Sequence, residues 1–91
     1  MSSERAATAA GLALTLITRR DCQLCEDFHA AVLAWDGARG QLQLQVIDVD
    51  TDARLMARYG LRVPVLLHGT DEICAFRFRG ERLAALQASG D

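Results

Sequence analysis

The stretch that decides the fold reads LALTLITRRDCQLC (residues 12–25). Its first half, residues 12–17, is a short apolar run in which leucines alternate with other side chains, and this pattern predicts a mostly buried strand. Arg19, Arg20 and Asp21 then provide a turn signal. From Cys22 onward the apolar residues recur at helical spacing, which predicts an amphipathic helix ending at Asp36-Gly37; they are Leu24, Phe28, Ala31, Val32 and Trp35.

Outward from this stretch, the chain predicts a second strand and a second helix. Residues 42–49 begin with leucines that alternate with glutamines and continue into an apolar end, as in a strand. Asp50 or Thr51 is expected to cap a short helix that Gly60 closes. A strand, a helix and a strand in this order predict a parallel pair joined by a right-handed crossover.

The last third of the chain predicts a hairpin and a closing helix. Pro64 precedes a strand-like run over residues 65–67, and because a proline cannot donate to a sheet, it is expected at the first position or the edge of that strand. Residues 68–71 form a hairpin turn, and residues 74–78 alternate as a final strand. With a helix after Gly80, the predicted order is βαβαββα.

Length and composition fit one small domain. The chain has 91 residues, of which 51% are hydrophobic and 24% charged, and this is enough for a single core. Residues 1–9 carry no useful periodicity and are predicted to be a flexible tail, which leaves 10–91 as the domain.

Charge and residue usage exclude several classes of function. The net charge is −2 and no basic run follows the chain, so a nucleic-acid partner is not expected. All ten basic residues are arginines, which excludes chemistry that requires a lysine, such as Schiff-base formation. The apolar stretches fall short of the roughly 20 residues that span a bilayer, so we expect no membrane partner. The three cysteines form no disulfide framework, which favours a cytoplasmic protein.

Cys22 and Cys25 are the candidate catalytic residues. Residues three apart on a helix lie within reach of a disulfide after a modest adjustment of the first turn. The unpaired N–H groups and the positive end of the helix dipole would stabilise a thiolate at Cys22, with Arg19 and Arg20 as nearby cations. Three acidic neighbours oppose this, so a moderate lowering of the Cys22 pKa is expected; they are Asp21, Glu26 and Asp27. Cys25, one turn deeper, is better suited to attack a mixed disulfide on Cys22.

The remaining candidates for chemistry have simpler structural interpretations. A zinc site would need two ligands beyond the cysteine pair, and Cys74, His29 and His68 match no zinc-site spacing. Cys74 alternates in phase with two phenylalanines and is interpreted as a small buried hydrophobic residue. Asp48 and Asp50 stand where a strand leads into a helix, so capping or solvation explains them better than a metal site.

With these motifs in this order, the chain resembles the thioredoxin-fold superfamily and, more narrowly, the small glutaredoxin-like proteins of bacteria. The resemblance covers about residues 12–87 and rests on the strand that leads into the cysteine pair, on residues 46–50, on residues 59–65 and on the terminal strand and helix. It implies an α/β thioredoxin-like fold with a four-stranded mixed sheet in the order 2-1-3-4, flanked by helices on both faces. It also implies a cis Val63-Pro64 bond that faces the cysteines.

The resemblance implies a thiol–disulfide oxidoreductase in which Cys22 attacks, Cys25 resolves the mixed disulfide, and the backbone of Val63 before Pro64 pairs with the substrate. Arg20 joins Val63 and Pro64 as a predicted substrate-binding residue. Expected partners are glutathione, as a co-substrate, or protein thiols, with a possible reductase; no dissociable cofactor or metal is required, and a monomer is expected. Two alternatives remain: a metal or iron–sulfur site completed by a second subunit, and a redox-inert binding module.

Overall fold

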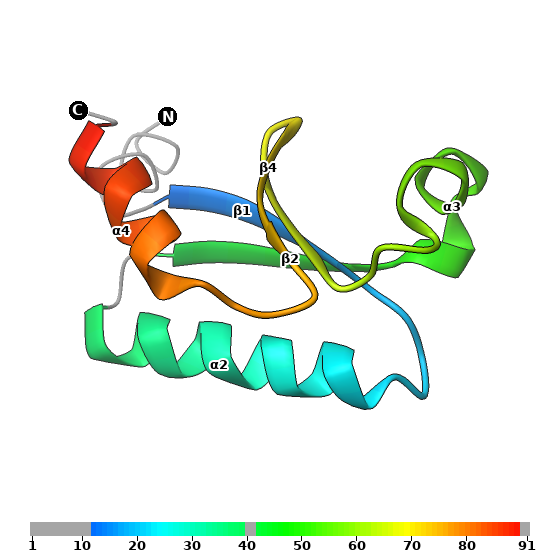
Figure 1. Cartoon of the computed structure of the whole chain (residues 1–91), viewed down its shortest axis with the longest axis horizontal. Helices are drawn as coiled ribbons and strands as arrows, with labels where there is room; N and C mark the ends of the chain where they lie inside the picture. The colour runs from blue at the N-terminus through cyan, green and yellow to red at the C-terminus, as the bar shows by residue number, and fades with distance from the viewer. Residues whose placement is uncertain (1–11, 40–41, 90–91) are drawn as a thin grey trace, which may run out of the picture.

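The computed structural model describes residues 12–39 and 42–89. Within these residues a four-stranded sheet carries three α-helices and one 3-10 turn (Figure 1); the elements are β1 (Leu12–Thr18), α2 (Gln23–Arg39), β2 (Leu42–Asp48), the 3-10 turn (Val49–Thr51), α3 (Ala53–Tyr59), β3 (Val65–His68), β4 (Asp71–Ala75) and α4 (Gly80–Ser89). This confirms the predicted βαβαββα order. The predicted tail, residues 1–9, lies outside the described residues, so the domain boundaries stay a prediction.

The sheet is mixed, with the strand order β2-β1-β3-β4 that the sequence resemblance implies. β1 pairs in parallel with β2, and β3 runs antiparallel to both β1 and β4. Ile17, near the end of β1, pairs with Val65, at the start of β3. Because of this register, the segments that follow β1 and β2 and the segment that precedes β3 all lie at one end of the sheet.

Helices pack on both faces of the sheet and create two cores. α2 and α4 cover one face, and α3 covers the other. The first core consists of Leu14, Leu16, Phe28, Val32, Leu66, Ile73, Cys74 and Leu83. The second consists of Ile17, Val49, Tyr59, Val65 and Leu67. Alternate residues of the central strand β1 serve the two cores, which explains why its sequence is apolar on both sides.

Two helix boundaries differ from the sequence prediction. α2 continues to Arg39, past the expected end at Asp36-Gly37, and the Asp36 carboxylate accepts the Leu42 N–H at 2.8 Å. The cap of α3 is Asp52, neither Asp50 nor Thr51, because those two residues belong to the 3-10 turn. The side chain of Asp52 accepts the first free N–H groups of α3, as an N-cap does.

The last strand is shorter than predicted. The sequence pattern extends it to Phe78, but β4 ends at Ala75. Phe76 adopts a φ of 68°, which turns the chain out of the sheet and breaks the alternation. Phe78 then packs edge-to-face on Phe28 with ring centroids 5.7 Å apart. The segment after β4 therefore crosses over α2 and does not continue the sheet.

Candidate functional site

Cys22 and Cys25 form a disulfide at the start of α2, with their Cα atoms 5.2 Å apart. Cys22 stands directly before the helix, and its carbonyl accepts the Glu26 N–H at 3.0 Å. Its Sγ accepts the Cys25 N–H at 3.1 Å, so the sulfur occupies the place of an N-capping oxygen. The pair is thus held in the first turn, where the helix leaves backbone donors without intrahelical partners.

The two sulfurs differ in accessibility. Cys25 is 2% exposed and belongs to the buried residues, whereas Cys22 is half-buried. An external sulfur atom therefore reaches Cys22 first. Cys25 stands beneath it, in position to form or break the internal bond.

The two arginines before the pair are engaged elsewhere. Arg19 donates to the Asp50 carboxylate at 3.2 Å and to the Gly60 carbonyl at 3.0 Å, so its charge is compensated by a carboxylate on the 3-10 turn. Arg20 is 85% exposed, and its Nε lies 3.9 Å from the Asp48 carboxylate. The helix start itself, more than an arginine, is therefore the electrostatic feature next to Cys22.

The Val63-Pro64 peptide bond is cis, as expected. Pro64 is fully buried, and its carbonyl accepts the Phe76 N–H at 2.8 Å. When the β1–β3 register is continued by one residue beyond Ile17 and Val65, Pro64 falls opposite Thr18, four residues before Cys22. The cis peptide and the loop that carries the cysteines thus leave the same end of the sheet.

The third cysteine is part of the core. Cys74 is buried in the core between the sheet and α2, and burial raises the pKa of its thiol. This matches its interpretation as a small hydrophobic residue. Among residues 12–39 and 42–89, no group of three or more His, Cys, Asp or Glu side chains gathers as a metal site would require.

Asp48 acts as a cap, as the sequence interpretation expected, whereas Asp50 forms an ion pair that the sequence did not predict. The side chain of Asp48 accepts the Asp50 N–H at 2.9 Å and caps the 3-10 turn, and Asp50 pairs with Arg19.

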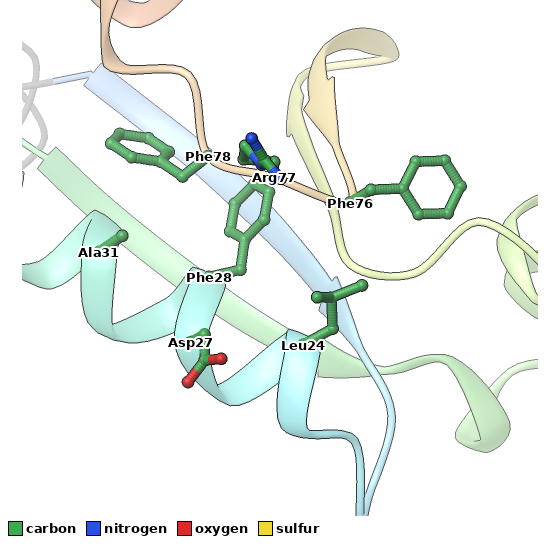
Figure 2. A pocket seen from close by; sticks show the side chains of 7 residues that line it. All are labelled: Leu24, Asp27, Phe28, Ala31, Phe76, Arg77 and Phe78. Carbon is green, nitrogen blue, oxygen red and sulfur yellow. The ribbon is translucent and has the colours of Figure 1, made fainter.

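Sequence reasoning missed a hollow beside the cysteine pair. It placed Leu24 on the apolar face of the first helix and Phe76 in the final strand, yet these side chains are 50% and 48% exposed. Both residues line a hollow of about 270 Å³ between the first turns of α2 and the segment after β4; Figure 2 shows the side chains around it. The full lining is Leu24, Asp27, Phe28, Ala31, Phe76, Arg77 and Phe78. The sequence signal was the Phe76–Phe78 spacing, which resembles a strand and gives no hint of the turn at Phe76.

This arrangement of a helix-capping disulfide, a cis-proline and a β2-β1-β3-β4 sheet can be compared with known proteins. The model of the glutaredoxin-like domain family (DUF836) matches residues 13–86. The chain belongs to this family. No curated protein matches its sequence.

Solved structures resemble this glutaredoxin-like domain. The structural genomics target protein XcR50 from X. campestris is 40% identical, with a TM-score of 0.62, over 84% of this chain and 97% of that one. The germline-specific thioredoxin Deadhead from Drosophila melanogaster is 21% identical, with a TM-score of 0.55, over 96% of this chain and 88% of that one. The second likeness confirms the thioredoxin-like fold. In the described part of the domain, none of the helices is long and apolar enough to cross a bilayer.

Proposed function

We propose that this glutaredoxin-like domain is a thiol–disulfide oxidoreductase that cycles Cys22 and Cys25 between dithiol and disulfide. The observation that carries the proposal is the disulfide itself, in which a half-buried sulfur at a helix start is bonded to a buried one. A bond meant only to brace the fold gains nothing from an accessible sulfur at the positive end of a helix. A redox bond needs both features.

The reduced protein would act in two exchange steps. The Cys22 thiolate attacks one sulfur of a partner disulfide, so a Cys22–partner disulfide forms and the partner's other sulfur leaves as a thiolate, which takes a proton from water. The Cys25 thiol then loses its proton to water, and its thiolate attacks the Cys22 sulfur. The Cys22–Cys25 bond forms and the second partner thiolate leaves. Two electrons pass from the protein to the partner, and two glutathione molecules or a dithiol reductase return them.

The local geometry favours Cys22 as the attacking group. In the disulfide, its sulfur already accepts the Cys25 N–H, and the same donor would stabilise a thiolate after reduction. The α2 dipole adds to this at its N-terminus. Because Arg19 is paired with Asp50, we assign the stabilisation of the thiolate mainly to the helix start.

The substrate side of the proposal uses the cis peptide. The Val63 backbone, next to the buried Pro64, would pair with the main chain of glutathione or of a protein segment, as strand-like hydrogen bonds do without regard to side chains. The exposed Arg20 would supply a cation for a carboxylate of that substrate. We propose that the protein works as a cytoplasmic monomer and requires no dissociable cofactor.

Two serine variants test the proposal. With bis(2-hydroxyethyl) disulfide as substrate and glutathione as reductant, Cys22→Ser should lose turnover, whereas Cys25→Ser should accumulate one mixed disulfide per chain, detected by intact mass. Cys74→Ser, which alters a thiol buried in the core, serves as the control and should keep the wild-type rate. Alkylation of the reduced protein at pH 7 should modify Cys22 first. Equal loss in all variants, or alkylation of Cys22 no faster than that of Cys74, contradicts the proposal.

A further inference from the structure

We infer that the hollow beside the cysteine pair receives a bulky apolar side chain that flanks the reacting cysteine of a protein partner, and that Phe76 and Leu24 select for it. This inference rests on the proposed function, since it names the substrate class of the same site. It would make a protein segment, more than free glutathione, the preferred substrate.

The backbone at Phe76 is arranged so that its ring faces outward. The Arg77 N–H donates to the Ala75 carbonyl at 2.7 Å, which closes a γ-turn centred on Phe76. With φ at 68°, this is the γ-turn with positive central φ, the rare and strained form. A bulky residue at positive φ is a conformational outlier. The Phe76 N–H also donates to the Pro64 carbonyl. The backbone that carries the ring is therefore held against the segment of the cis-proline.

Leu24 supplies the opposite rim from within the cysteine motif. It stands between Cys22 and Cys25 on the first turn of α2 and lines the hollow together with Phe76. Figure 2 shows Leu24 on the first turn of α2 and Phe76 on the segment after β4, with the Phe76 ring directed away from Leu24 and Phe28. Two half-exposed apolar side chains from separate elements thus border the hollow, and one of them lies within the cysteine motif.

The size and charge of the hollow indicate what fills it. Its volume of about 270 Å³ is slightly below the roughly 300–1,000 Å³ of small-molecule pockets, so it suits one large side chain. Asp27 and Arg77, the charged residues of its lining, have opposite signs and favour neither an anion nor a cation. The selecting contact is therefore apolar.

The side chain that fills the hollow belongs to the substrate chain, because the reacting cysteine of that chain is bonded to Cys22. Once a partner sulfur is bonded to Cys22, the residues next to that sulfur are held beside Leu24. An extended chain advances about 3.3 Å per residue, so a side chain one or two positions away remains within reach of the hollow. Glutathione consists of glutamate, cysteine and glycine units and has no apolar side chain to place there.

Peptide disulfides test the inference. Two symmetric disulfide dimers are compared, one of acetyl-Ala-Phe-Cys-Ala amide and one of acetyl-Ala-Ser-Cys-Ala amide. Either sulfur of such a dimer presents the same neighbours. The second-order rate constant for reduction of each dimer by the reduced protein is measured by chromatography. It is divided by the rate constant with free dithiothreitol, which corrects for a difference in intrinsic reactivity between the two peptide disulfides. The expected preference for the Phe peptide is about tenfold, a difference of about 1.4 kcal/mol.

Single substitutions show which residues cause the preference for the Phe peptide. Phe76→Gly, Phe76→Ala and Leu24→Ala should each bring the ratio of the two peptides towards one. Glycine suits the positive φ, so Phe76→Gly keeps the test valid if the alanine variant folds poorly. The control is Leu61→Ala, which removes a leucine that is 96% exposed and does not line the hollow, and it should keep the wild-type ratio.

The outcomes separate the two proposals. Exchange with both peptides at a ratio near one in the wild type overturns the inference and leaves the proposed function standing. A tenfold ratio that persists in Phe76→Gly and in Leu24→Ala also overturns it. If the wild type exchanges with neither peptide and does not react with bis(2-hydroxyethyl) disulfide, the proposed function fails and the inference fails with it.

Discussion

Glycine in place of Phe76 is expected to leave the oxidised protein more stable than alanine in the same place. Both changes remove the same aromatic ring, so the loss of its packing affects the two variants almost equally. They differ only in how the new residue tolerates a φ of 68°. At ordinary positions the order is the reverse, because glycine loses more backbone entropy on folding.

The magnitude follows from two opposing effects. A left-handed conformation costs a residue with a Cβ about 1–2 kcal/mol, and glycine is free of this cost. Glycine loses roughly 0.5–1 kcal/mol through its greater freedom in the unfolded chain. The difference in the free energy of unfolding is about 0.5–1 kcal/mol in favour of Phe76→Gly. For a domain of this size, that corresponds to a Tm difference of roughly 2–8 °C.

Urea denaturation of the oxidised variants, followed by circular dichroism, measures this difference. Ala84, exposed on α4, provides the control for the usual order, because Ala84→Gly should lower the free energy of unfolding by about 1 kcal/mol. If Phe76→Ala proves as stable as Phe76→Gly or more so, the turn is not strained at Phe76. The ring would then need another explanation for its outward position.

Three further predictions concern stability. Asp52→Ala should lower the free energy of unfolding by about 1 kcal/mol, because two N–H groups of α3 lose their acceptor. Asp52→Asn should keep most of the wild-type stability, since an amide oxygen can still accept these bonds. Equal urea midpoints for Asp52→Ala and the wild type would refute the cap. Since burial raises the pKa of the folded Cys74 thiol, its contribution is fully present below the unfolded pKa of about 8.5 and is lost as pH rises towards the folded pKa. Cys74→Ala should thus flatten the fall in the urea midpoint between pH 8 and 10, and an unchanged slope contradicts this. A double-mutant cycle of Arg19→Ala and Asp50→Ala should give a coupling of about 0.2–1 kcal/mol because the pair is partly exposed; no coupling in low salt contradicts it.

The fold could be predicted because its signals are local and repeated. The alternation in residues 12–17 and the helical spacing after Cys22 each specify an element, and Pro64 marks where the third strand begins. The position of the cysteine pair at a strand-to-helix junction then placed the disulfide at the start of α2. These features depend on neighbours in sequence, which a reader of the sequence can see.

The site could be predicted only in part, because its surroundings depend on tertiary contacts. Arg19 appears in sequence as a cation next to the cysteines, and only the fold reveals that Asp50 engages it. Phe76 continues an alternating pattern, and only the hydrogen bond to the Pro64 carbonyl and the turn at positive φ reveal that it leaves the core. Spacing cannot show which of two plausible directions a side chain takes when a distant element decides it.

The burial of Cys74 has a practical consequence for any laboratory that handles the protein. Of its three cysteines, two are joined and the third is sealed inside the core, so a thiol-specific dye should find nothing to label in the folded, oxidised form. After reduction the half-buried Cys22 becomes the first site to take the dye, and unfolding the reduced chain opens all three. A mass spectrum of labelled protein thereby reads the redox state and the folded state together, without an engineered reporter.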